Sequence, residues 1–381
     1  MTNPYSPACH HPCRHGVLPA IPQLKKMRQW ARAHPGMAPA LSASDLSYGG
    51  GGGIGVTTGH EKVYLVLYGS QWGTQGTGAN GDLNLAGDPA GEAPCLQEFF
   101  KGLGAGGELW SGVVAQYCDG VATGAQSCPA GNTEHVAYPT GGALAGVWAD
   151  ESAPSPQTAT GHDLGVEAVK AAAHFGSTSA APNRDAQYVI LSPAGTNPDN
   201  WLTGGFGAWH DYNGDTTLSG GAVASPYGDV AFTNFPYVPD AGTTCGQYAV
   251  NLDGTLDGVS IAGGHEHAET ITDQNPPVVP GDPGGWTGSA GPETGDKCAW
   301  VFPGTPGGMF DLSLTTGSFA VQATWSNDGA GGAGDCEASH AIVTNGSPST
   351  VTVSSPAARP APWARQPACR SAPPARPPGR R

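Results

Sequence analysis

The chain has 381 residues, enough for one large domain or two ordinary ones. Gly and Pro together make up about a quarter of it, a level associated with low complexity, but ten Trp, eleven Tyr and nine Phe exclude a fully disordered chain. All 31 acidic residues lie between Asp45 and Glu337, where only five of the 16 basic residues occur. This span therefore carries 26 net negative charges, and we expect it to bind neither nucleic acid nor an anionic membrane surface.

The first 44 residues contain a basic patch but no apolar stretch of the kind that defines an export signal. We expect residues 1–44 to be either a disordered leader or a segment included through a misassigned start codon. In both cases we expect them to pack against no other part of the chain. No stretch of the chain approaches the ~20 apolar residues that a membrane-spanning helix needs. Residues 49–53 are consecutive glycines, which indicate a flexible joint at the start of a domain spanning 45–350.

Hydrophobic periodicity and turn residues predict the elements of this domain in chain order. We expect a buried strand at 62–69, a helix at 95–103 continuing at 110–117, a helix at 162–175, strands at 187–193 and 231–237, a helix at 257–273 and a strand at 318–325. Strands and helices do not alternate regularly, which favours an α+β fold. We therefore expect one large, loop-rich domain in which the helix at 257–273 packs against a mixed sheet.

The helix at 257–273 carries the motif H-E-x-x-E, formed by His265, Glu266 and Glu269. It differs by one residue from the H-E-x-x-H helix that binds zinc in many metallopeptidases. His265 and Glu269 lie one turn apart on one face and can bind the same ion, since carboxylate oxygen is an ordinary zinc ligand. Glu266 occupies the position of the general base that takes a proton from metal-bound water. The alternative is a group of solvated polar residues on a surface helix.

A catalytic zinc site needs a third protein ligand and one open position. Asp296 is favoured slightly, because a disulfide at Cys298 can fix its loop, and His210 is the next candidate, because His is the commonest metal ligand. Glu293 shares the loop of Asp296, and Asp273 reaches the site only if the helix bends at its end. The alternatives are a core or loop histidine at His210 and a turn-forming Asp at Asp296.

Six cysteines lie between residues 45 and 350, and none forms a C-x-x-C pair: Cys95, Cys118, Cys128, Cys245, Cys298 and Cys336. An even number in a Gly-rich, Lys-poor domain predicts disulfides and an oxidising compartment. We expect Cys118–Cys128 to close a local loop and Cys298–Cys336 to form a second bridge. Buried free thiols are the alternative.

Other motifs carry less chemistry. The sequence lacks the G-x-S-x-G turn of α/β-hydrolases. With 31 acidic residues, a carboxylate pair for glycoside hydrolysis stays an alternative. Residues 211–215 resemble half of a calcium loop but lack its Gly and its bidentate Glu, so we expect an exposed turn. His267 points away from the face of His265 and is expected to be solvated.

Five segments together resemble a family of secreted, uncharacterised actinobacterial proteins. They are GHEKVYLV at 59–66, YPTGG at 138–142, AWHDY at 208–212, GHEHAE at 264–269 and GDKC at 295–298. These proteins in turn resemble, distantly, the plant Exordium or phosphate-induced protein family, whose members are extracellular and lack the H-E-x-x-E residues. The resemblance covers residues 46–345 and implies secretion, but it implies no activity.

The chain departs from this family at two places. Family members have Cys where this chain has Gly207, a difference that would leave Cys245 without a partner. They also continue into an immunoglobulin-like repeat, which residues 351–355 would begin here. Residues 357–381 instead contain six Arg and no acidic residue, and we expect a disordered tail, or a reading-frame error, that contacts nothing.

These patterns lead to two functional hypotheses. The first is a secreted, monomeric zinc hydrolase, a metallopeptidase acting on a polypeptide or cell-wall substrate, with Glu266 as general base and His265, Glu269 and either Asp296 or His210 as ligands. The second is a non-catalytic extracellular or cell-wall binding module of Exordium type, with a structural or decayed site. A third ligand within ~5 Å and an open cleft favour the first hypothesis.

Overall fold

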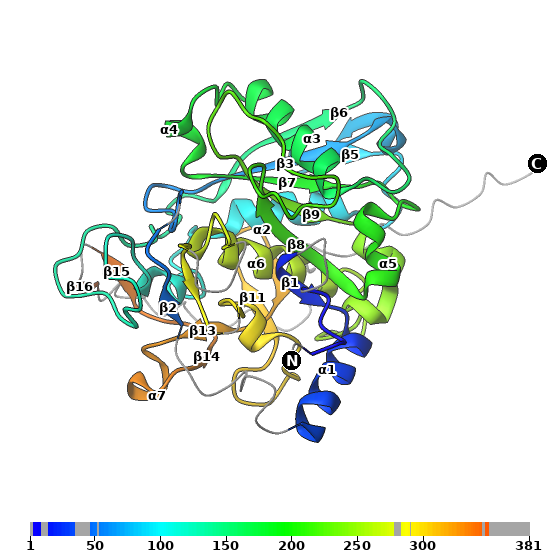
Figure 1. Cartoon of the computed structure of the whole chain (residues 1–381). Helices are drawn as coiled ribbons and strands as arrows, with labels where there is room; N and C mark the ends of the chain where they lie inside the picture. The colour runs from blue at the N-terminus through cyan, green and yellow to red at the C-terminus, as the bar shows by residue number, and fades with distance from the viewer. Residues whose placement is uncertain are drawn as a thin grey trace, which may run out of the picture.

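The centre of the molecule is a six-stranded mixed sheet with the strand order β1-β8-β9-β7-β3-β6 (Figure 1). The computed structural model describes residues 3–8, 14–34, 46–51, 53–277, 283–289, 291–344 and 347–349. The strands of the central sheet are β1 (His15–Pro19), β3 (Lys62–Tyr68), β6 (Leu144–Asp150), β7 (Ala186–Leu191), β8 (Phe206–Tyr212) and β9 (Ala231–Phe235).

Strand directions change at one side of this sheet. β6, β3, β7 and β9 run parallel, whereas β8 pairs antiparallel with β9, and β1 pairs antiparallel with β8. The parallel strands β3 and β7 are almost continuously apolar and buried, as expected for strands covered on both faces. The α+β fold with a mixed sheet is therefore confirmed.

Helices cover both faces of the sheet, with α3 on one face and α2 and α6 on the other (Figure 1). The helices are α1 (Ile21–Ala33), α2 (Glu92–Gly102), α3 (Gly161–His174), α4 (Ala180–Asn183), α5 (Trp201–Gly204), α6 (Asp257–Thr272) and α7 (Gly329–Gly332). A capping box between Thr160 and Asp163 begins α3, and Gly176, with φ 76°, follows its end. Helix α6 ends shortly before Pro276 and Pro277, which cannot continue it.

Most predicted elements are confirmed, with differences at two places. The predicted strands at 62–69, 187–193 and 231–237 are β3, β7 and β9, and the predicted helices at 95–103, 162–175 and 257–273 are α2, α3 and α6. The expected helical continuation at 110–117 is a series of turns with one 3₁₀ segment, Val114–Gln116. The expected strand at 318–325 is divided between two small sheets.

Within the described ranges, five two-stranded sheets surround this framework. They pair β2 (Ser47–Tyr48) with β10 (Trp286–Thr287), β4 (Gln75–Thr77) with β5 (Leu83–Leu85), β11 (Phe310–Ser313) with β12 (Ser318–Val321), β13 (Thr324–Ser326) with β14 (Asp335–Glu337), and β15 (Ile342–Thr344) with β16 (Ser347–Ser349). Both predicted disulfides, Cys118–Cys128 and Cys298–Cys336, are present. Cys245 is a buried free thiol.

The N-terminal segment belongs to the fold, so the expectation that residues 1–44 contact nothing is wrong for residues 14–34. Strand β1 adds to the central sheet, and its Val17 and Leu18 are buried. Leu24 of α1 packs in the main hydrophobic core. The expectation rested on composition, whereas this short strand is specified by a pairing partner far along the chain.

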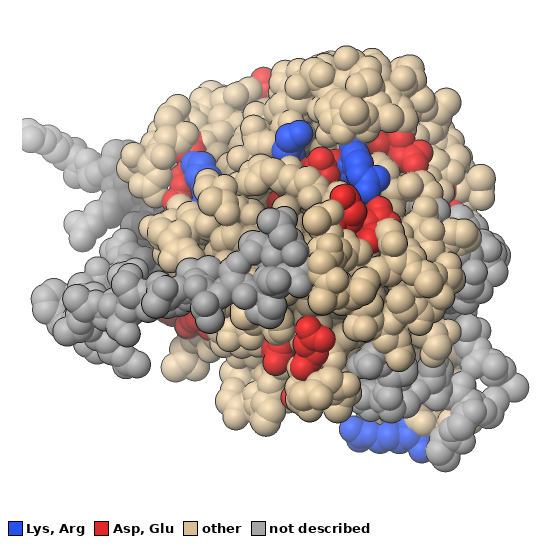
Figure 2. Space-filling model, turned by 90° about the vertical axis from the view of Figure 1, so that its left-hand side faces the viewer, with Lys and Arg blue, Asp and Glu red and all other residues tan. Residues whose placement is uncertain are grey.

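Several expectations fall on residues that the structure does not describe. They concern residues 1–2, 9–13 and 35–44 of the expected leader, the immunoglobulin-like strand at 351–355 and the tail at 357–381. Within the described part of the chain, every helix is too short or too polar to cross a membrane. On the face drawn in Figure 2, the few basic side chains are separated from one another and most lie beside acidic ones. Among the described residues, ion pairs join Lys101 to Asp82, Lys170 to Asp150 and Arg184 to Asp119.

Candidate metal centre

Helix α6 carries the H-E-x-x-E motif through the middle of the molecule and is buried along its whole length. As the spacing predicts, His265 and Glu269 lie together, with 3.2 Å between His265 Nε2 and Glu269 Oε2. Neither atom has a hydrogen-bond partner of good geometry within the described residues. A helix this polar is costly to bury unless its polar groups have partners, so the surroundings of this pair are informative.

Glu269 is held so that one oxygen stays free. Its Oε1 accepts hydrogen bonds from the backbone amides of Gly295 and Asp296, at 3.0 and 2.8 Å. The loop that supplies these amides comes so close that a side chain at Gly295 would collide with His265 and Glu269. The carboxylate is therefore oriented by its Oε1, and its Oε2 is directed toward the histidines.

His265 is oriented by Gln322, a residue between β12 and β13. Gln322 Nε2 donates to the carbonyls of Gly295 and Ala323, so its Oε1 is the atom that faces His265 Nδ1, at 3.2 Å. Nδ1 must therefore carry the proton, and in a neutral ring Nε2 is the unprotonated nitrogen that faces Glu269. Fixing the outer nitrogen in this way is how proteins orient histidine ligands of metals.

His210, from strand β8, approaches the same carboxylate from the sheet. Its Nδ1 lies 3.8 Å from Glu269 Oε2 and 3.5 Å from Glu266 Oε2 and has no hydrogen-bond partner in the described part of the chain. Its Nε2 lies 3.3 Å from the Asp273 carbonyl and 3.5 Å from Glu293 Oε2. If His210 were only a packed core histidine, the missing hydrogen bond of its buried Nδ1 would have no explanation.

The loop after β10 contributes Glu293 and Asp296. Asp296 Oδ1 lies 3.9 Å from His265 Nε2, and Glu293 approaches His210. The disulfide Cys298–Cys336 anchors the 3₁₀ segment that contains Asp296 (Asp296–Cys298), as the sequence predicts. We refer to His210, His265, Glu266, Glu269, Glu293 and Asp296 as the motif cluster.

The spacing within the motif cluster suits a metal ion. Ligands ~2.0–2.2 Å from a tetrahedral zinc are separated from one another by ~3.4 Å. The distances from Glu269 Oε2 to the two imidazole nitrogens are 3.2 and 3.8 Å. Two overlapping sets have all their ligand atoms within 4.8 Å of one another, namely His265, Glu269 and Asp296, and His210, Glu269 and Glu293. The residues present therefore fit a divalent cation, with Glu269 common to both sets.

The carboxyl groups of the cluster are strained electrostatically without a cation. Burial raises the pKa of Glu266 and Glu293 well above the ordinary value, and the charge of Glu269 raises it further. Burial and Glu269 together raise the pKa of Asp296 to about 8, and burial raises the pKa of Asp273 to about 7. Carboxyl groups this close cannot all ionise unless a positive charge lies among them.

The two histidines do not supply enough positive charge. Burial lowers the pKa of His210 to about 4, so its ring is neutral. Burial also lowers the pKa of His265, but Glu269 and Asp296 outweigh this effect and raise it. For Glu269, the desolvation cost is outweighed by His265 and His210, and its pKa is lowered. A divalent cation would stabilise the ionised form of every carboxyl group here.

Glu266 lies at the side of the cluster next to His210. Burial of its carboxyl group is complete, and neither oxygen reaches hydrogen-bond geometry with a described group, although the Leu18 backbone is close enough to lower its pKa somewhat. The position agrees with a group that accepts and returns a proton beside the ligands.

The remaining polar residues near the motif lie outside the ligand sets, and two of the expectations about them are wrong. Asp273 joins neither ligand set, because its Oδ1 accepts from the Gly285 amide. His267 points away from His265 as expected, but it is buried rather than solvated and contacts Gln187 and Glu61. The expected exposed turn at 211–215 is wrong too, because Asp211 and Asp215 are fully buried. Tertiary packing decides all three, since neighbours in sequence do not supply these partners.

Strand β1 crosses directly over the motif cluster and, among the described residues, closes it on that side. Gly16 of β1 lies against His210 and Glu269 so closely that a Cβ atom would overlap both side chains. His265, His210 and Glu269 are fully buried. Sequence reasoning missed Gly16 and Gln322, because neither belongs to a motif and both approach from distant parts of the chain.

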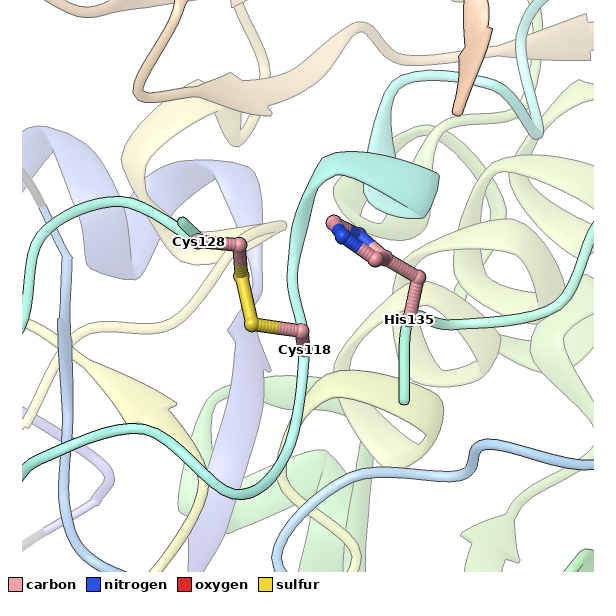
Figure 3. A group of neighbouring side chains, drawn as sticks. All are labelled: Cys118, Cys128 and His135. Carbon is pink, nitrogen blue, oxygen red and sulfur yellow. A yellow bond between two sulfur atoms is a disulfide. The ribbon is translucent and has the colours of Figure 1, made fainter. Parts of the chain in front are cut away.

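A second group, Cys118, Cys128 and His135, also lies within metal-binding distances. Figure 3 shows that the two sulfur atoms are joined in a disulfide beside His135. Disulfide sulfur is not a thiolate ligand, so in this state the group is a structural bridge.

No protein-family model, curated protein or solved structure matches this chain. The chemistry of the motif cluster therefore carries the function proposed below.

Proposed function

We propose that the protein is a zinc-dependent hydrolase, a metallopeptidase, and that it acts outside the cell on a polypeptide or cell-wall substrate. The observation that carries the proposal is that one ligand atom each of His265, Glu269 and Asp296 lies within 4.8 Å of the other two, while His265 Nε2 and Glu269 Oε2 are buried with no hydrogen-bond partner among the described residues. A buried polar atom without a hydrogen-bond partner needs a physical explanation, such as a catalytic role or a bound ion. An imidazole nitrogen and two carboxylate oxygens form a ligand set that zinc accepts.

When bound, zinc would supply a Lewis acid and an acidified water molecule. The chain supplies the remaining functions. Gln322 and the amides of Gly295 and Asp296 orient the ligands, and Glu266 is placed to hold and return a proton. The two disulfides suit an oxidising, extracellular environment, and they support secretion together with the resemblance to a secreted family.

The second candidate is the non-catalytic extracellular or cell-wall binding module of Exordium type. The observation in its favour is the burial of the cluster beneath β1, since a catalytic site needs access. Against it, ligand atoms beyond the His265–Glu269 pair lie within the ~5 Å limit at which a metal site becomes feasible. The two candidates differ in whether Glu266 takes part in a reaction.

Zinc retention tests the site. The purified full chain is stripped with a chelator, dialysed against zinc at neutral pH, and analysed for metal content. We expect one zinc per wild-type chain, retention by Glu266→Gln, and an affinity lowered more than about 100-fold by Glu269→Gln, which removes a shared ligand. Glu151→Gln, at an exposed carboxylate, is the matched control and should bind as wild type does. Absence of stoichiometric zinc in the wild-type chain would overturn the proposal.

Hydrolysis separates the two candidates. Labelled casein is offered to zinc-loaded wild type and to a Gly16→Leu chain, in which β1 cannot lie over the cluster. We expect cleavage by the Gly16→Leu chain and its loss when Glu266→Gln is added. Zinc binding without cleavage in any of these chains would favour the binding module.

A further inference from the structure

Strand β1 is the outermost strand of the central sheet on the side next to α6. It pairs antiparallel with β8, the strand that carries His210, and His15 lies directly opposite His210. If β1 were withdrawn, β8 would become an edge strand whose free backbone groups lie beside the motif cluster. Such an edge is a ready template for an extended polypeptide.

The pairing of β1 is irregular at the point where it crosses the cluster. The register shifts between His15 and Leu18, and Gly16 between them has φ 47°, a conformation that favours glycine. At this bend the Gly16 backbone packs on His210 and Glu269, and any side chain there would overlap them. Pairing with β8 alone does not require this bend. The bend brings the backbone of β1 against histidine and carboxylate atoms that have no hydrogen-bond partner among the described residues.

The residues before and after Gly16 each make separate contacts with the rest of the chain. Arg14 pairs with Asp199, and His15 Nε2 lies 3.1 Å from Asp215 Oδ2. Val17 and Leu18 are buried in the core. After the strand, the Pro19 carbonyl accepts a hydrogen bond from Trp300 Nε1, at 2.7 Å. Backbone pairing supplemented by separate side-chain environments is how proteins recognise peptides as an added strand.

We propose that residues 14–20 occupy, within the same chain, the groove in which an extended polypeptide binds. The polypeptide would pair antiparallel with β8 in place of β1. The contacts of β1 define its class: a basic residue, a glycine two positions later where the backbone passes over the cluster, and two aliphatic residues after that glycine. What the cluster does to such a polypeptide rests on the proposed hydrolase function, but binding to the β8 edge does not require zinc.

The test uses the full chain with β1 displaced. Gly16→Leu and the milder Gly16→Ala both place a side chain where His210 and Glu269 lie. Lys25→Leu, at an exposed position of α1, adds the same side chain to the same segment without touching the groove and is the matched control. The probe is a fluorescent peptide with the sequence of residues 14–20, RHGVLPA, and a second peptide carrying Gly16→Leu controls for non-specific binding.

Fluorescence anisotropy then reports binding of the probe. We expect Gly16→Leu to bind the native-sequence peptide at least about tenfold more tightly than wild type or Lys25→Leu, because an occupied groove lowers the apparent affinity. The peptide carrying Gly16→Leu should bind none of the chains. A folded Gly16→Leu or Gly16→Ala chain that fails to bind the native-sequence peptide would overturn the proposal.

Hydrogen exchange on the same chains distinguishes displacement from unfolding. We expect lost protection of amides in β1 and β8, with β3 and β7 protected as in wild type. Loss of protection throughout the sheet in both glycine variants would also overturn the proposal, because β1 would then be an indispensable part of the core. Zinc content, measured separately, keeps the two proposals apart: peptide binding without zinc refutes only the hydrolase, and zinc without peptide binding refutes only the groove.

Discussion

Gly295→Ala perturbs the candidate metal centre without removing any ligand. Gly295 has no side chain, and its amide donates to Glu269 Oε1 while its carbonyl accepts from Gln322 Nε2. A Cβ atom on this backbone would lie 2.6 Å from His265 Nδ1 and 2.9 Å from Glu269 Oε1. Ordinary contacts between such atoms need ~3.5 Å, so the loop or the ligands must move by more than half an ångström.

The displacement would act on both stability and metal affinity. Overpacking of a dense interior typically costs about 1–3 kcal/mol. The same movement lengthens the hydrogen bonds that orient Glu269 and His265, and loss of such outer contacts lowers metal affinity by about 10–100-fold. We therefore expect Gly295→Ala to reduce the zinc affinity by at least tenfold while the chain stays folded.

Zinc affinity is measured by competition with a chelator of known affinity, and the free energy of unfolding by urea titration of the zinc-free protein. Gly76→Ala is the matched control, because Gly76 has ordinary backbone dihedrals and only one distant contact for a Cβ atom. It should change neither quantity. Wild-type zinc affinity in Gly295→Ala would refute the inferred ligand geometry, because the collision would then not be transmitted to the ligands.

Three further outcomes follow from individual contacts. Gln322→Leu removes the acceptor that fixes His265, so zinc affinity should fall by about 10–100-fold, measured by the same competition. Burial, and after it the neighbouring Asp150, raises the pKa of Glu167 from the ordinary 4.5 to about 8. The folded chain therefore favours the protonated carboxyl group. This contribution to the free energy of unfolding is complete below pH 4.5 and is lost as the pH rises through 8. Urea titrations at pH 5 and 8 should show this loss in wild type and a much smaller one in Glu167→Gln; equal losses would contradict the assignment. A Cβ atom at Gly207 would lie 3.7 Å from Cys245 Sγ, so Gly207→Cys should form a disulfide, seen as a lost free thiol by titration, and add about 3–4 kcal/mol under non-reducing conditions; two free thiols in the oxidised variant would contradict this.

The sequence determined the parts of this protein that depend on neighbouring residues. The apolar runs of β3, β7 and β9, and the helical periodicity of α3, specify those elements directly, because each pattern is local. The pairing of His265 with Glu269 follows from the same kind of rule, since residues four apart meet on any helix. Both predicted disulfides are present, and Cys118–Cys128 follows from a local rule because it closes a short loop.

Tertiary structure alone decided what surrounds the motif. His210 and Asp296 were both candidates for the third ligand, and packing brings each of them close to Glu269, an outcome that spacing along the chain cannot fix. Gln322 orients His265 without belonging to any motif. Strand β1 shows the limit most clearly, because the composition of residues 1–44 indicates disorder, whereas Gly16 and Leu18 have their places only through the edge of β8. Contacts between residues far apart in sequence leave no periodic signal, so only the folded chain shows that its own N-terminal strand covers the cluster.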